Sequence, residues 1–138
     1  MDGRSVKANR TGTGRIAALG ADYRSTIDSQ VLVIPQIEDM ASVDNAEAIL
    51  AVEGVDIGFL GPNDLALSMG VEPEHSDHEA AIQAVPAAGI RTGKPLGLPV
   101  RDVKGVKQRL SEGFRFLDCA SDLRLLQVGA IDILHELG

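Results

Sequence analysis

Hydrophobic positions along the chain alternate between short apolar runs and longer segments with helical spacing. Strands are predicted over residues 31–34, 55–60, 95–100 and 114–119. Apolar runs of this kind, Val31–Ile34 above all, are typical of strands buried in a parallel sheet. Helical spacing follows the strands, over residues 42–54, 65–69, 76–88, 103–113 and 123–137. The pattern therefore predicts four successive strand–helix units.

Alternating strands and helices indicate the α/β class, with a parallel sheet covered by helices. Two architectures fit this pattern: a small doubly wound sheet, or half of an eight-stranded (β/α) barrel. The chain has 138 residues, whereas a complete barrel usually needs about 250. In both architectures functional groups gather at the carboxyl ends of the strands.

Several local signals predict where elements begin and end. Ser42 is expected to be the N-cap of the first helix, and Ser76–Glu79 has the spacing of a capping box. Pro86 should kink or shorten the helix in which it lies. The single cysteine, Cys119, is expected to be a small buried hydrophobic residue in the fourth strand, since free cysteines are usually buried.

The first thirty residues differ from the rest in being rich in Gly, Arg, Thr and Asn. They predict an extended arm with a short helix, so that residues 1–30 form an N-terminal segment and residues 31–138 the folded unit. Thr11–Arg15 resembles a phosphate-binding loop, but it lacks the preceding strand and the Gly-Lys-Ser/Thr ending. The arm is expected at most to bring Arg10 or Arg15 near an anionic substrate.

Charge and composition exclude several classes of function. The net charge is −7, there is no Trp, and residues 25–90 contain twelve acidic and no basic side chains. A general nucleic-acid-binding protein needs a broad basic face, so no nucleic-acid partner is expected. No apolar run approaches the roughly 20 residues that span a bilayer, and Met1–Arg4 lacks the apolar core of a secretory signal. A soluble, cytoplasmic protein without a membrane partner is expected.

Two of the acidic residues follow neighbouring predicted strands. Glu38 comes after the first strand and Asp64 after the second, so both carboxylates are expected at the same edge of the sheet. Oxygen ligands suit Mg²⁺ or Mn²⁺, and Mg²⁺ commonly takes only one or two carboxylates. The alternative is that Asp64 caps a helix and Glu38 is solvated.

The histidines are expected to have no catalytic role. His75 and His78 lie at a helix entrance among acidic residues, and polar first-turn positions explain them better than metal ligation or base catalysis. His135 is expected at a surface or an interface.

Two longer motifs carry a resemblance to a known family. Residues 31–39, VLVIPQIED, are followed by residues 52–70, VEGVDIGFLGPNDLALSMG. Together they resemble the HpcH/HpaI aldolases, the metal-dependent class II pyruvate aldolases of the phosphoenolpyruvate/pyruvate barrel superfamily. The likeness extends over about residues 3–126, which correspond to the C-terminal half of the family's barrel. The resemblance thus implies a partial (β/α)8 TIM barrel of about four C-terminal strand–helix units.

The resemblance also implies a function for individual residues. Glu38 and Asp64 would bind a divalent metal, Mg²⁺ or Mn²⁺, and Gln36 and Asp64 would contact the substrate. Asn63, through its backbone, would help to hold the pyruvate carboxylate. The implied reaction is the cleavage of 2-keto-3-deoxy or 4-hydroxy-2-oxo acids to pyruvate and an aldehyde through a metal-stabilised enolate.

The same resemblance predicts what this chain lacks. The family's general-base histidine and a substrate-binding arginine belong to the N-terminal half of the barrel, so no catalytic base is expected among the residues of this chain. A half-barrel exposes two strand edges and part of an apolar interior, which favours a homo-oligomer. The alternative function is a non-catalytic oligomerisation or interaction module derived from the barrel.

Overall fold

The protein is described from a computed structural model, which covers Ile27 and residues 30–137. The predicted N-terminal arm, with Arg10 and Arg15, lies outside these described residues. The described residues from Val33 onward form one compact unit. Within the described residues, no helix is long and apolar enough to span a membrane.

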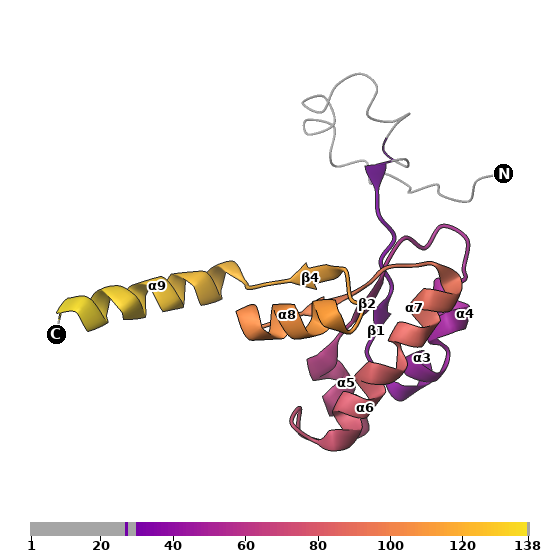
Figure 1. The fold of residues 1–138 in the computed structure, drawn as a ribbon, viewed down its shortest axis with the longest axis horizontal. Coiled ribbons are helices and arrows are strands. Elements are labelled where there is room, and N and C mark those ends of the chain that lie inside the picture. The colour runs from indigo at the N-terminus through magenta and orange to yellow at the C-terminus, as the bar shows by residue number, and fades with distance from the viewer. Residues whose placement is uncertain (1–26, 28–29, 138) are drawn as a thin grey trace, which may run out of the picture. The chain divides into compact units, whose positions relative to one another are not determined.

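A four-stranded parallel sheet forms the centre of the compact unit (Figure 1). Its strands are β1 (Gln36–Ile37), β2 (Gly58–Leu60), β3 (Leu96–Pro99) and β4 (Phe116–Asp118). They are hydrogen-bonded in the order β1-β2-β3-β4, which is also their order along the chain. A doubly wound sheet reverses direction at a switch point, so this order is that of a barrel segment.

Helices connect and follow the strands. In chain order they are α3 (Met40–Asp44), α4 (Ala46–Leu50), α5 (Pro62–Met69), α6 (Ser76–Ala84), α7 (Pro86–Thr92), α8 (Val103–Ser111) and α9 (Asp122–Leu137). The predicted effect of Pro86 is confirmed, because α6 ends just before it and α7 begins with it. Proline fits the first turn of a helix, where its missing N–H has no intrahelical acceptor.

The sheet has one covered and one open face. Alternate strand residues point to opposite faces, and the buried set faces the helices and forms the core with Val43, Leu50 and Ile82. The opposite face carries Phe59 and Phe116, whose rings meet edge to face with centroids 5.9 Å apart. Phe116 is 41% exposed. The strands are therefore buried on one side, and the functional residues lie toward the other.

The first strand is shorter and later than the apolar pattern predicts. Val31, Leu32 and Val33 are exposed and lie outside β1. The Val33 N–H donates to the carboxylate of Asp56 at 2.8 Å, which takes the place of a backbone partner. The strand prediction over residues 31–34 is therefore wrong.

Two side-chain predictions for the last third of the chain are also wrong. The helical spacing of Val103, Val106 and Leu110 predicts that they point inward, but Val103 and Leu110 are exposed on α8. Cys119, expected to be buried, is exposed immediately after β4. Each position follows or flanks the last strand of the sheet, where the described residues supply no further layer to cover it.

Candidate functional site

The carboxyl ends of β1 and β2 bring the predicted site residues to one edge of the sheet. Parallel pairing sets Gln36 opposite Phe59 and Ile37 opposite Leu60. Because Ile37 is fully buried against the helices, Gln36 and Glu38 belong to the open face. Asn63 and Asp64 follow β2 at the same edge, in the first turn of α5.

Gln36 and Glu38 both approach Gly61, the residue that directly precedes α5. A Cβ atom at this position would lie 3.1 Å from both Cβ and Oε2 of Glu38 and 3.4 Å from Nε2 of Gln36. The Gly61 N–H donates to the Ile37 carbonyl at 3.0 Å, which holds the backbone beside the end of β1. A side chain here would displace the glutamate or the glutamine, so the glycine leaves the space in which Gln36 and Glu38 lie. Sequence analysis missed this function of Gly61.

The adjacent carboxylates of Glu38 and Asp39 have different environments. Asp39, and not Ser42 as predicted, is the N-cap of α3, and its carboxylate accepts the Ser42 N–H at 2.6 Å. This backbone hydrogen bond, with a second from the Ser42 side chain, lowers the pKa of Asp39. The Glu38 carboxylate accepts no hydrogen bond from another described residue. The Asp39 carboxylate is thus used to cap α3, whereas the Glu38 carboxylate is available to a ligand.

Asn63 and Asp64 lie where a helix has unpaired backbone donors. Gly61 is the N-cap of α5, supplies no side-chain cap and is followed by Pro62. The amides of the first turn lack intrahelical acceptors, so those of Asn63 and Asp64 are available to a carboxylate at the positive end of the helix. Both side chains are exposed, and the Asp64 carboxylate has no hydrogen-bonding partner among the residues that the structure describes.

This donor set fits a divalent cation with oxygen ligands. Glu38 and Asp64 supply two carboxylates, and Gln36 adds an amide beside them. Across Ile27 and residues 30–137, no three His, Cys, Asp or Glu residues come together as a metal site. Two carboxylates with remaining positions for water and substrate suit Mg²⁺ or Mn²⁺.

The three histidines are held in different ways. His75 is the N-cap of α6, where its Nδ1 accepts the Asp77 N–H at 3.2 Å, so the capping box predicted for Ser76–Glu79 is wrong. His78 lies in the first turn of α6, as predicted, but is 3% exposed. His135 is exposed on α9. The burial of His78 was not foreseen.

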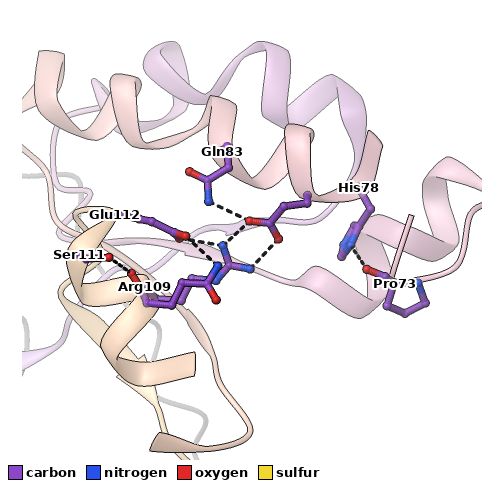
Figure 2. A network of polar contacts seen from close by, with 8 residues as sticks. Pro73, His78, Gln83, Arg109, Ser111 and Glu112 are labelled. Carbon is purple, nitrogen blue, oxygen red and sulfur yellow. Dashed lines mark hydrogen bonds and ion pairs between the residues drawn. The ribbon is translucent and has the colours of Figure 1, made fainter. Parts of the chain in front are cut away.

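A charged cluster joins α6 to α8 and was not predicted (Figure 2). The Arg109 guanidinium donates to both carboxylate oxygens of Glu79 at 2.7 and 2.8 Å and to Glu112 at 2.8 Å. The bond from Arg109 lowers the pKa of Glu79. A hollow of about 420 Å³ lies beside this cluster, bounded among others by Asn63 and Arg101. The cluster fixes one wall of the space next to the predicted site.

Comparison with known proteins places this geometry in a family. The family model of the HpcH/HpaI aldolase/citrate lyase domain matches residues 5–128. A hydroxypyruvate/pyruvate aldolase of Paraburkholderia phytofirmans is 37% identical over 130 residues, which is 91% of this chain and 50% of that protein. A 4-hydroxy-2-oxovalerate aldolase of Novosphingobium aromaticivorans is 41% identical over 117 residues, 83% of this chain and 44% of that protein.

Two solved structures from the same family superimpose on this chain. An HpcH/HpaI aldolase/citrate lyase family protein from Burkholderia cenocepacia superimposes with a TM-score of 0.82 and 36% identity, over 94% of this chain and 52% of that one. An HpcH/HpaI aldolase from Desulfitobacterium hafniense gives a TM-score of 0.73 at 25% identity. The expected partial (β/α)8 barrel is thereby confirmed, and the chain spans about half the length of the relatives it matches. The chain belongs to the HpcH/HpaI aldolase/citrate lyase family.

Proposed function

We propose that this chain carries the metal- and pyruvate-binding part of a class II aldolase. The reaction is the cleavage of a 2-keto-3-deoxy or 4-hydroxy-2-oxo acid to pyruvate and an aldehyde. The observation that carries the proposal is the meeting of Gln36 and Glu38 at Gly61, beside the unpaired first turn that contains Asn63 and Asp64. The names of the aldolase relatives support the same reaction class.

Each residue has a role that follows from its position. Glu38 and Asp64 would hold Mg²⁺ or Mn²⁺, since their carboxylates have no other partner among the described residues. The Gln36 amide would donate to the substrate, and the backbone N–H of Asn63 would donate to the pyruvate carboxylate. The bound cation would supply Lewis-acid stabilisation of the negative charge that develops on the keto oxygen as the carbon–carbon bond breaks.

The proton acceptor for cleavage is not among the histidines that the structure describes. His75 caps a helix through Nδ1, His78 is enclosed by two backbone carbonyls, and His135 is on α9. We therefore propose that the base comes from an N-terminal half-barrel. This chain alone would bind the metal with pyruvate or its analogue oxalate, while cleavage would need that second half.

Calorimetry with Mn²⁺ and oxalate tests this proposal. The wild-type chain should bind oxalate only in the presence of Mn²⁺, and Glu38→Gln or Asp64→Asn should weaken binding about tenfold or more, as loss of metal-site residues does. Glu53→Gln is the matched control, because Glu53 is an exposed carboxylate that precedes β2, at the other end of the strand. A folded wild-type chain that shows no metal-dependent oxalate binding would refute the site assignment, as would an equal loss in the control.

The second candidate function is a non-catalytic oligomerisation or interaction module. It is favoured by α9, whose side chains are all exposed although many are Leu, Ile or Val. Light scattering and an aldol-cleavage assay separate the two candidates. An oligomer that stays inactive toward 2-keto-3-deoxy acids after addition of an N-terminal half-barrel would support this module.

A further inference from the structure

His78 is the one buried polar or charged side chain in the described part of the chain. Both of its ring nitrogens face backbone carbonyl oxygens: Nδ1 lies 2.9 Å from the Pro73 oxygen, and Nε2 lies 2.7 Å from the Pro62 oxygen. Figure 2 shows the ring directed at Pro73 from α6. The histidine therefore links α6 to two separate points of the preceding backbone.

The Pro62 carbonyl is the more informative of these two partners. Pro62 is the first residue of α5 and directly precedes Asn63 and Asp64. The Gly61 side of this turn is held by the Leu65 N–H, which donates to the Gly61 carbonyl at 2.8 Å. The bond from His78 adds a tertiary contact to the same turn, from a helix that begins 14 residues further along the chain.

The two contacts of His78 require a side chain that can donate a hydrogen bond. Carbonyl oxygens only accept hydrogen bonds, so each contact requires an N–H on the ring nitrogen that faces it. A neutral imidazole has one N–H and can bond one of the two carbonyls, whereas an imidazolium can bond both. An apolar residue of similar size would fill the space and leave the carbonyls without this partner.

We propose that His78 is a positioning residue that fixes the first turn of α5, and with it the Asn63 backbone and the Asp64 carboxylate. It acts through the Pro62 carbonyl and is assigned no contact with substrate or metal. The consequence for ligand binding rests on the proposed metal and pyruvate site. The consequence for the backbone of α5 does not depend on the proposed function. Ligand binding and backbone position are therefore measured separately.

The test uses the 138-residue chain with four substitutions. His78→Leu removes both ring nitrogens, and with them any hydrogen bond to the Pro62 or Pro73 carbonyl. His78→Gln places an N–H near the position of Nε2, toward Pro62, and His78→Asn places one near Nδ1, toward Pro73. Ile82→Ala is the matched control, because Ile82 is buried one turn further along α6 and its loss removes core packing while leaving the His78 ring in place.

Amide NMR measures the first consequence. In His78→Leu and His78→Asn, the Asn63 and Asp64 amides should shift and the Leu65 N–H should exchange faster with solvent. In His78→Gln and Ile82→Ala they should stay close to their wild-type positions. Unchanged Asn63 and Asp64 amides in a folded His78→Leu variant would overturn the inference, as would equal shifts in Ile82→Ala.

Mn²⁺-dependent oxalate binding measures the second consequence. His78→Leu should weaken it about tenfold, as removal of a residue supporting a metal ligand does, and His78→Gln should restore most of the loss. Wild-type affinity in His78→Leu would overturn the positioning role at this site. If the wild-type chain binds no Mn²⁺–oxalate while the amides still move in His78→Leu, the proposed function fails and the positioning of α5 by His78 stands.

Discussion

The close approach of β3 and β4 at Gly97 gives a sharp test of the sheet. Gly97 pairs with Phe116, and a Cβ atom at position 97 would lie 2.1 Å from the Phe116 carbonyl oxygen and 2.9 Å from its Cβ. Ordinary contacts are 3.4 Å or longer, so Gly97→Ala requires the strands to separate by more than 1 Å. Backbone atoms cannot rotate away as a side chain can, and the strain therefore falls on the hydrogen bonds between the strands.

The size of the effect follows from this geometry. Overpacking usually costs about 1–3 kcal/mol, and a clash with backbone puts Gly97→Ala at the upper end, about 3 kcal/mol. For a unit of this size such a loss lowers Tm by about 12 °C or more. The bonds at risk flank the contact: the Arg115 N–H donates to the Leu96 carbonyl and the Val100 N–H to the Asp118 carbonyl, both at 2.8 Å.

Thermal unfolding followed by circular dichroism, with hydrogen exchange at Val100 and Arg115, measures this prediction. Gly105→Ala is the matched control, because a Cβ atom there would meet its nearest neighbour at 3.4 Å and alanine is a better helix former than glycine. A Gly97→Ala chain that melts within about 2 °C of wild type, with both amides still protected, would refute the β3–β4 register.

The remaining predictions concern α8. Arg109→Leu should lower the unfolding free energy by about 3 kcal/mol in urea titrations at pH 7, since it leaves Glu112, only 19% exposed, without its cation; a loss below 1 kcal/mol would contradict this. Arg109 lowers the folded-state pKa of Glu79, so the stabilisation is complete above the unfolded pKa of about 4.3 and is lost as pH falls through the folded pKa. The wild-type advantage over Arg109→Leu should therefore shrink below about pH 4. Asp102→Ala removes the carboxylate that accepts the Gly105 N–H at 2.7 Å and should cost about 1 kcal/mol, whereas Asp132→Ala, in the exposed α9, should leave the main transition unchanged.

Local signals in the sequence predicted the elements that depend on local chemistry. Gly70 ends α5 in the left-handed region, with φ of 69°, where glycine has no steric penalty. Pro86 separates α6 from α7. The order of four strand–helix units follows from the alternation of apolar patterns and is found in the sheet. At Gly70 and Pro86 the deciding interaction lies within a few residues of the signal.

Two incorrect predictions concern segments in which a polar side chain binds a backbone group. The apolar run before Pro35 suggested a strand, but the Asp56 carboxylate accepts the Val33 N–H, and the paired strand residues are only Gln36 and Ile37. Helical spacing suggested one helix after β1, but Asn45 leaves the helical conformation between α3 and α4, with φ of −101° and ψ of 12°, and its side chain donates to the Ala41 carbonyl at 2.7 Å. Side chains that compete for backbone groups in this way are not visible in a hydrophobic pattern.

The candidate site was predicted in part for the same reason. Glu38 and Asp64 follow adjacent strands, and parallel pairing alone brings them to one edge. The sequence could not show that Asp39 is used as a cap, which leaves Glu38 as the available carboxylate of the pair. Nor could it show that His78 reaches Pro62 across 16 residues, since that contact depends on how α6 packs beside α5.

The candidate site lies on the open face of the sheet, which the other half of the barrel would cover in a full-length relative. Gln36 and Glu38 belong to the face on which Phe59 and Phe116 meet, and the relatives that this chain matches are about twice as long. A half-barrel that closed the sheet would cover these aromatic rings and bring its own strand ends to the edge that holds Glu38 and Asp64. Association with such a half-barrel would then bury the two aromatic rings and complete the proposed site at the same time. Under the proposed function, a chain with only this part of the site would bind metal and pyruvate without cleaving a substrate.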